Sequence, residues 1–179
     1  MSDSMDQSAD QRDMEWARLW MRKSADVIAE NREYLIELDR QIGDGDHGEN
    51  MDRGFSAVVR GNGLEDAQTR KDLLKYVART LLSTVGGAAG PLYGTAFLRA
   101  SQELDDPDVT PESVAVVLAA ATGGVQTRGK AAAGEKTMVD ALLPAVAAAK
   151  EAASAGEGVR ASLRSAADAA QQGVENTKP

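Results

Sequence analysis

The amino-acid sequence predicts an all-α fold, and three of its features support that prediction. Aromatic residues make up only 4% of the 179 residues, whereas hydrophobic residues make up 42%. A core with so few aromatic side chains must be built from aliphatic residues and alanine, which is the strongest helix former. Apolar residues recur at three- and four-residue spacing along most of the chain, and no alternating pattern of useful length indicates a strand.

The first helix is predicted at residues 14–38, after a polar and acidic stretch at residues 1–13. This N-terminal stretch carries no apolar periodicity, so we expect a flexible tail. The apolar residues of the first helix fall roughly on one stripe, and they are Trp16, Leu19, Trp20, Val27, Ile28, Leu35 and Leu38. A stripe of this kind indicates an amphipathic helix.

Six further helices follow, and breaks that contain glycine or proline separate them. They are expected at residues 49–60, 64–84, 91–98, 111–126, 137–153 and 158–174. Thr110 suits the N-cap of the fifth helix, with Pro111 at its first position and Glu112 in its first turn. Because the length suggests one domain and the sequence contains no linker, we expect residues 14–179 to form a single helical domain.

The charge and composition exclude several classes of protein. The formal net charge of −8 disfavours a nucleic-acid partner and an anionic membrane surface, since both attract basic proteins. The chain has no cysteine, which excludes disulfides, zinc thiolates and a cysteine nucleophile. It also has no apolar run of the roughly 18 residues that a membrane span needs, and no signal peptide. A cytoplasmic location without membrane attachment is therefore expected.

The break after the first helix concentrates carboxylates. Asp44 and Asp46 lie next to glycines, and Asp39 precedes Asp44 by five residues at the end of the helix. Carboxylate oxygens are hard ligands that suit Mg²⁺ or Ca²⁺, and three of them in one tight turn would repel one another without a cation. A solvated surface turn is the alternative, because acidic residues and glycines are common in such turns.

An EF-hand does not explain this acidic loop. A calcium loop that started at Asp44 would have Phe55 at its twelfth position, where a bidentate glutamate is needed. Mg²⁺ instead shares its coordination shell with phosphate oxygens, so the loop suggests a phosphate ligand. His47, the only histidine, is either a general base or a ligand contact, and we favour the ligand contact.

Two later breaks contain features that suit a phosphate. Residues 83–91 contain three glycines just before a helix, where close backbone approach and helix-terminal amides favour anions. Many glycine-rich helix connections bind nothing, so this feature is weak by itself. Residues 128–138 add Arg128 and Lys136 near a helix start, where an anion would offset their charge. Met138 could lie against an adenine ring, although a methionine at such a position is more often part of a core.

Together these three breaks resemble a known family. The stretches IGDGDHGENMDRGF, LLSTVGGAAGPLYGTAF and TRGKAAAGEKTMVDALLPA are similar, in this order, to the ADP-binding L subunit of bacterial dihydroxyacetone kinases. The similarity runs from about Trp16 to Lys178. It implies an up-and-down barrel of amphipathic antiparallel helices, eight in the family, with the nucleotide site at one end. The resemblance leaves open whether the eighth helix is present here.

The resemblance also implies a set of ligand residues. Asp39, Asp44 and Asp46 would hold two Mg²⁺ ions against the phosphates of ADP or ATP. The nucleotide itself would be contacted by His47, Gly48, Glu49, Asn50, Met51, Gly87, Ala88, Ala89, Gly129, Lys136, Thr137 and Met138. No residue of this chain is expected to act as a catalytic acid, base or nucleophile.

The implied activity is that of one subunit of a kinase. A separate K subunit would hold dihydroxyacetone, and an M subunit of the phosphotransferase system would rephosphorylate ADP in place. One alternative is an ATP-exchanging L-type subunit for another short ketose or polyol kinase. A second alternative is a non-catalytic nucleotide-binding regulator, since short L subunits also bind a transcription regulator in some bacteria.

Overall fold

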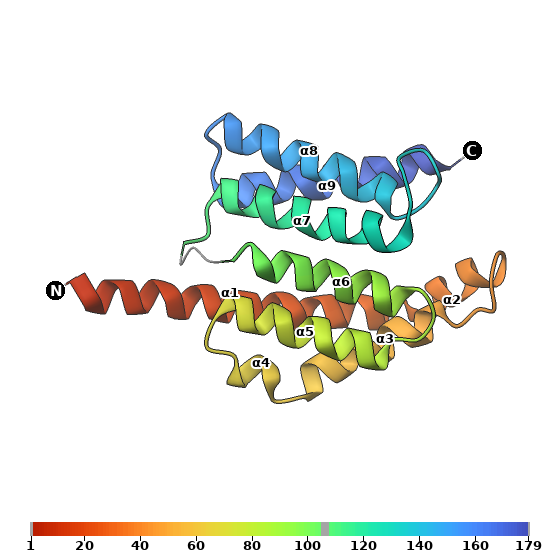
Figure 1. Ribbon diagram of the computed structural model, residues 1–179, viewed down its shortest axis with the longest axis horizontal. Coiled ribbons are helices and arrows are strands. Elements are labelled where there is room, and N and C mark those ends of the chain that lie inside the picture. Colours follow the sequence, from red (N-terminus) through yellow and green to blue (C-terminus); the bar gives the residue numbers. More distant parts are fainter. Residues whose placement is uncertain (1, 105–107, 179) are drawn as a thin grey trace. The chain divides into compact units, whose positions relative to one another are not determined.

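The computed structural model describes residues 2–104 and 108–178, which contain nine helices and no strand (Figure 1). The all-α prediction is confirmed. The helices are α1 (Ser2–Glu30), α2 (Arg32–Arg40), α3 (His47–Arg60), α4 (Gly63–Asp66), α5 (Arg70–Thr84), α6 (Ala89–Gln102), α7 (Pro111–Gly129), α8 (Val139–Ser154) and α9 (Val159–Thr177). The chain divides into two compact units, Met1–Leu98 and Arg99–Pro179, and the boundary lies within α6. The single domain and the barrel stay predictions.

Two of the predicted helices are each divided into two. The first ends at Glu30 because the side-chain amide of Asn31 donates a hydrogen bond to the Val27 carbonyl, 2.8 Å away, and α2 begins at the next residue. The predicted helix at 64–84 is divided because Thr69 caps a new helix, α5, by accepting the Asp72 amide at 3.1 Å.

The N-terminal helix is longer than expected. Residues 2–13, expected to be a flexible tail, belong to α1, which begins at Ser2. Asp13 forms an ion pair with Arg70 of α5, with 3.3 Å between the two side chains. The polar composition of this segment hides the helix from a search for apolar periodicity, and whether the segment is flexible stays a prediction.

The buried face of α1 is not the stripe of large apolar residues. Met14, Ala17, Met21 and Ala25 are buried and repeat at helical spacing. The tryptophans keep about half of their surface exposed, and Trp16 stacks on Trp20 with 6.0 Å between ring centroids. Small and unbranched side chains on the buried face let the neighbouring helices approach closely.

In the first unit α3 packs against α1, α2 and α5. The fully buried side chains of this unit include Met21, Val58, Leu73, Val77 and Leu81. This packing holds the start of α3 and the end of α5 in fixed positions, and the two loops considered below leave the core at these points. Figure 1 shows both loops at the same end of the first unit.

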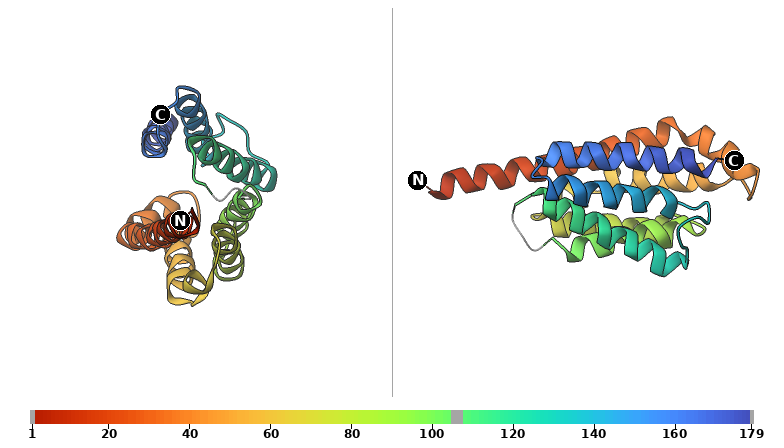
Figure 2. Two further views of the ribbon diagram at one scale, coloured as in Figure 1. Left: turned by 90° about the vertical axis from the view of Figure 1, so that its left-hand side faces the viewer. Right: turned by 90° about the horizontal axis from the view of Figure 1, so that it is seen from above.

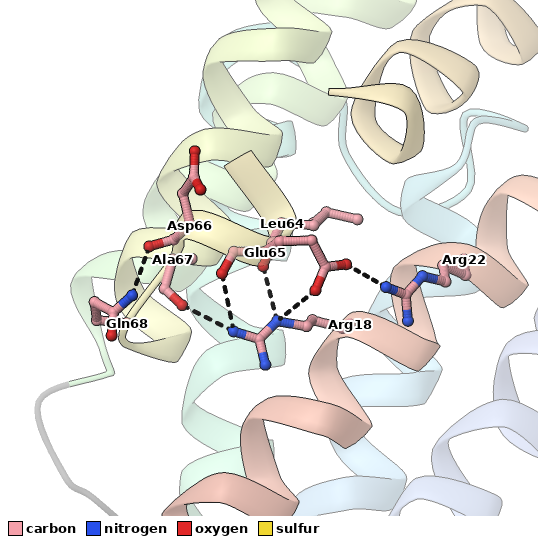
Figure 3. Close-up of polar contacts among 7 residues, drawn as sticks. All are labelled: Arg18, Arg22, Leu64, Glu65, Asp66, Ala67 and Gln68. Atoms are coloured by element: carbon pink, nitrogen blue, oxygen red, sulfur yellow. Dashed lines mark hydrogen bonds and ion pairs between the residues drawn. The ribbon is translucent and has the colours of Figure 1, made fainter. Parts of the chain in front are cut away.

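Arg18 of α1 secures the short helix α4 (Figure 3). Its guanidinium donates to the main-chain carbonyls of Leu64 at 2.9 Å, Glu65 at 3.3 Å and Ala67 at 3.1 Å. These carbonyls lie at the C-terminal end of α4, where helix geometry leaves them without partners. The side chain of Arg22 binds only the Glu65 carboxylate in this group of residues.

Replacing Arg18 should therefore destabilise the first unit. We expect Arg18→Met to lower the free energy of unfolding by about 2 kcal/mol, because it removes charged hydrogen bonds to three carbonyls. Arg22→Met is the matched control, and its loss should stay below about 0.5 kcal/mol because an exposed ion pair contributes little. Urea unfolding of both variants tests this. Equal losses for the two would contradict the role of Arg18.

The second unit is built from three helices that run alongside one another, α7, α8 and α9 (Figure 2). The alanines Ala115, Ala145, Ala149 and Ala166 are buried together at its centre. The predicted start of α7 is confirmed, since Thr110 accepts the Ser113 amide at 3.1 Å and Pro111 is the first helical residue. Within the described segments no helix is long and apolar enough to cross a membrane.

Candidate metal and nucleotide site

The acidic loop between α2 and α3 brings three carboxylates together. Asp39 lies in the last turn of α2, and Asp44 and Asp46 follow in the loop. Their ligand oxygens all lie within 4.8 Å of one another, and Asp44 and Asp46 are exposed to solvent. Gly45, between these two aspartates, has a φ of +77°, which an L side chain rarely adopts. Three convergent carboxylates, two of them exposed, suit a hard cation such as Mg²⁺. The structure thus brings the three predicted ligand residues together, and their binding of a metal stays a prediction.

Asp39 also has a structural role in this loop. Its Oδ2 accepts the backbone amides of Asp46 at 2.9 Å and His47 at 3.2 Å, and Asp46 is the N-cap residue of α3. A carboxylate at this position satisfies free amides and stabilises the positive end of the helix dipole. Asp39 therefore caps α3 from the preceding helix, and its Oδ1 makes none of these bonds.

Two glycines allow the loop to close tightly. A Cβ on Gly43 would lie 2.4 Å from Asp39 Oδ1, and a Cβ on Gly48 would lie 2.2 Å from the carbonyl oxygen of Arg32. Both distances are far shorter than any real contact to a Cβ atom. The first turn of α3 thus rests directly on the main chain of α2, which fixes the aspartates between the two helices.

The residues predicted to contact the nucleotide from α3 differ in exposure. His47 is half-buried at the first position of the helix, and Glu49 is exposed and pairs with Arg32 at 2.8 Å. Asn50 is 5% exposed and Met51 is 4% exposed, with Met51 among the core side chains. The ligand contacts of these residues stay predictions.

The glycine loop between α5 and α6 is the second part of the site. Gly87 has a φ of +62°, Gly87 and Ala88 are exposed, and Ala89 is buried at the start of α6. A Cβ on Gly90 would lie 2.3 Å from the Val85 carbonyl oxygen, so only glycine fits there. The exposed amides just before a helix are the groups that bind phosphate in many proteins.

The structure brings the glycine loop close to the acidic loop. Asn50 lies one helical turn after Asp46, and its side-chain Oδ1 is 3.0 Å from the position that a Cβ on Gly86 would take. The two loops belong to one unit and leave the same end of the core. This proximity could not be deduced from the spacing of the two motifs in the sequence.

The third loop, residues 130–138, lies in the second unit. Of the predicted ligand residues in this region, Gly129 at the end of α7 is exposed, as are Lys136 and Thr137, and Met138 is half-buried before α8. Lys136 has a φ of +55°, a conformation that is uncommon for a residue other than glycine. A cleft in the second unit is lined by residues that include Lys136 and Asp140.

Asp140 organises this loop and was missed by the sequence analysis. Its carboxylate accepts the amides of Gly134 at 2.5 Å and Thr137 at 3.1 Å. These bonds hold the pKa of Asp140 below its ordinary value, and the bond from the Gly134 amide has the largest effect. The signal was present, because a threonine followed three residues later by an acid is the pattern of a capping box.

The lowered pKa of Asp140 predicts a pH dependence. Folding favours the ionised carboxylate, so its stabilising effect is fully present above the pKa of the unfolded chain and disappears as the pH falls through the folded-state pKa. We expect Asp140→Asn to destabilise the protein at pH 7, and the difference from wild type to shrink below about pH 4. Urea unfolding at several pH values tests this. A difference that is constant with pH would contradict it.

Residues 41–179 match the family model of the DAK2 domain. The chain belongs to the DAK2 domain family. Its DAK2 region contains Asp44 and Asp46, the glycine loop and all of the second unit, whereas Asp39 precedes the matched region.

Two curated relatives of this DAK2 protein are named as ADP-binding subunits of a dihydroxyacetone kinase. It is 42% identical over 134 residues to the "PEP-dependent dihydroxyacetone kinase 1, ADP-binding subunit DhaL" of Listeria innocua, covering 75% of this chain and 68% of that relative. It is 40% identical over 162 residues to the "PEP-dependent dihydroxyacetone kinase, ADP-binding subunit DhaL" of Escherichia coli, covering 88% and 76%. The predicted resemblance to this family of subunits is confirmed.

A solved structure resembles this DAK2 protein over most of its length. It is the dihydroxyacetone kinase from C. freundii in complex with AMP-PNP and Mg²⁺. The TM-score is 0.69 at 25% sequence identity, and the match covers 90% of this chain but only 28% of that chain. The helical fold of this protein therefore also occurs within a much longer kinase chain.

Proposed function

We propose that this protein is the nucleotide-carrying subunit of a dihydroxyacetone kinase. In this proposal Asp39, Asp44 and Asp46 hold two Mg²⁺ ions, and the amides of Gly87 and Ala88 face the phosphates of ADP or ATP. The observation that carries the proposal is the convergence of three carboxylates within 4.8 Å, beside an exposed glycine loop in the same unit. The names of the relatives, ADP-binding subunits of dihydroxyacetone kinases, support the same nucleotide.

The residues of this chain would position the nucleotide and neutralise its charge. Bound Mg²⁺ would offset the negative charge that the phosphates and the carboxylates share. Phosphoryl transfer needs little covalent chemistry from a protein, so carboxylates that hold the metal and amides that hold the phosphates are sufficient. His47 and Asn50 would contact the nucleotide from the first turn of α3. The contributions of Gly129, Lys136, Thr137 and Met138 from the second unit stay predictions.

The acceptor would be dihydroxyacetone held on a separate K subunit. We infer further that ADP stays bound and that a phosphotransferase-system M subunit rephosphorylates it in place. Support comes from the relatives, which are described as PEP-dependent and as one subunit of the enzyme. A carried nucleotide would then act as a cofactor rather than as an exchanging substrate.

Denaturing the purified protein and identifying the released small molecules tests the proposal. We expect about one ADP per chain after purification in Mg²⁺, with loss of ADP after prolonged treatment with a chelator. An empty protein that binds ATP reversibly would instead favour the exchanging type of kinase. A protein that binds neither ADP nor ATP in the presence of Mg²⁺ would overturn the proposed function.

A further inference from the structure

One side chain on the surface of the first unit connects α3 to the end of α5, the two helices that border the loops of the proposed site. Arg53 lies on α3, two turns after the acidic loop. Its Nε donates to the main-chain carbonyl of Thr84 at 2.9 Å, and its Nη2 donates to the side-chain Oδ1 of Asn50. A single guanidinium thus binds the last residue of α5 and the first turns of α3.

The bond to Thr84 fixes the point where the glycine loop begins. Thr84 is the last residue of α5, and the carbonyls at the end of a helix have no partner within the helix. A cation at that end also interacts favourably with the helix dipole. Because Val85 and Gly86 follow directly, the position of Thr84 sets the course of the glycine loop.

The bond to Asn50 fixes the orientation of a buried amide. A guanidinium can only donate, so the Asn50 oxygen must face Arg53 and the Asn50 amino group must point away from it. That amino group makes no hydrogen bond with the described part of the chain, so it keeps two donors for a ligand. Asn50 lies against Gly86, whose Cβ position would be 3.0 Å from Asn50 Oδ1 and 3.3 Å from Asn50 Nδ2.

We propose that Arg53 is a positioning residue of the nucleotide site. It holds the helix that follows the acidic loop and the helix that precedes the glycine loop at a fixed separation, and it turns the donor side of Asn50 toward the nucleotide. With the two helices so placed, phosphate oxygens bound by the glycine-loop amides would also coordinate the metal bound by the aspartates. This inference rests on the proposed function. Arg53 would act through Thr84 and Asn50 and would not itself contact the nucleotide.

The exposed location of Arg53 makes this proposal testable. Arg53 itself and its bond to Thr84 are exposed, whereas its bond to Asn50 is partly buried. The melting temperature of each Arg53 variant is therefore measured beside its affinities. The competing role is direct attraction of the phosphates by the charge of Arg53. Arg53→Lys separates the two roles. A lysine ammonium keeps the charge, but it cannot donate to two acceptors in the fixed planar geometry of a guanidinium.

Calorimetric titrations with Mn²⁺ in place of Mg²⁺ provide the test. Mn²⁺ is titrated into nucleotide-free protein, and ADP is then titrated into protein saturated with Mn²⁺. For Arg53→Lys and Arg53→Met we expect Mn²⁺ affinity within about twofold of wild type, and ADP affinity lowered by about tenfold, a typical size for energetic coupling between sites. The matched control is Arg18→Met. It also removes hydrogen bonds from a guanidinium to main-chain carbonyls, but these carbonyls are far from both loops in the sequence.

The outcomes separate this inference from the proposed function. Arg18→Met should lower the melting temperature and leave both affinities unchanged. Wild-type ADP affinity in Arg53→Lys would overturn the positioning role and assign Arg53 a charge contact. An equal loss of Mn²⁺ and ADP affinity would also overturn it, because Arg53 would then support only the acidic loop. If wild-type protein saturated with Mn²⁺ binds no ADP, the proposed function itself fails and the inference fails with it.

Discussion

Asp44→Ala is expected to weaken the binding of ADP in the presence of Mg²⁺ by about a hundredfold. Removing a residue that only hydrogen-bonds to a metal ligand typically costs about 10- to 100-fold in metal affinity, and removing a ligand itself should cost at least as much. Asp44 is exposed and lies among other carboxylates, so its removal takes away one ligand and also relieves repulsion in the metal-free protein. The helical content should therefore stay at its wild-type value, and the free energy of unfolding without metal should not fall below that of the wild type.

Asp39→Ala is the matched variant, because Asp39 has a second role. It should lose a similar amount of ADP affinity, and in addition about 1 kcal/mol of stability without metal, since it caps α3 through the amides of Asp46 and His47. Calorimetry with ADP and Mg²⁺, and urea unfolding in a chelator, measure the two effects separately. Retained affinity in Asp44→Ala would show that the metal assignment is wrong. Equal stability of the two variants would show that Asp39 is not a cap.

The sequence predicts those parts of the structure that depend on interactions between residues close together in the chain. The glycines around Asp44 and Asp46, and those from Gly86 to Gly90, mark turns in which main-chain atoms come close together, and the structure has turns at both places. The start of α7 was also predictable, because Thr110 and its cap partner lie three residues apart. Short-range patterns of this kind depend on a few neighbouring residues and on well-known turn chemistry.

The parts that the sequence did not indicate depend on contacts between distant segments. Arg53 and Thr84 are 31 residues apart, and nothing in their spacing shows that one binds the other. The buried face of α1 also differs from the apolar stripe in its sequence, because burial depends on which neighbours approach a helix and not only on its own apolar residues. Asn31 divides the first helix through a hydrogen bond of its side chain, which helix periodicity does not reveal.

In the proposed function, the carboxylates and the glycine-loop amides of the first unit would hold the metal and the phosphates. Asp39 is both a cap for α3 and a candidate ligand, so folding of α3 places two aspartates beside a third. Arg53 then connects α3 to the end of α5. The candidate site is therefore formed by the same contacts that join the helices, and substitutions at these contacts should affect stability and ligand binding in different proportions.

Gly48→Ala is expected to reduce both stability and nucleotide binding. The added methyl group would lie 2.2 Å from the Arg32 carbonyl oxygen and 2.9 Å from Ile36 Cγ1, so α2 and α3 must separate. Such overpacking typically lowers stability by about 2 kcal/mol, which outweighs the gain of up to about 1 kcal/mol in helix propensity. Asp39 lies on α2 and Asp46 at the start of α3, so the separation also moves the ligands apart.

Gly123→Ala in α7 provides the matched control for this substitution. A Cβ on Gly123 would have no other atom within 4 Å, so alanine should fit without strain. Its better helix propensity and the smaller entropy of the unfolded chain should raise the free energy of unfolding by about 0.5–1 kcal/mol. Urea unfolding and ADP calorimetry on both variants compare the two glycines. If Gly48→Ala is as stable as Gly123→Ala and binds ADP with wild-type affinity, then close contact between α2 and α3 does not position the aspartates.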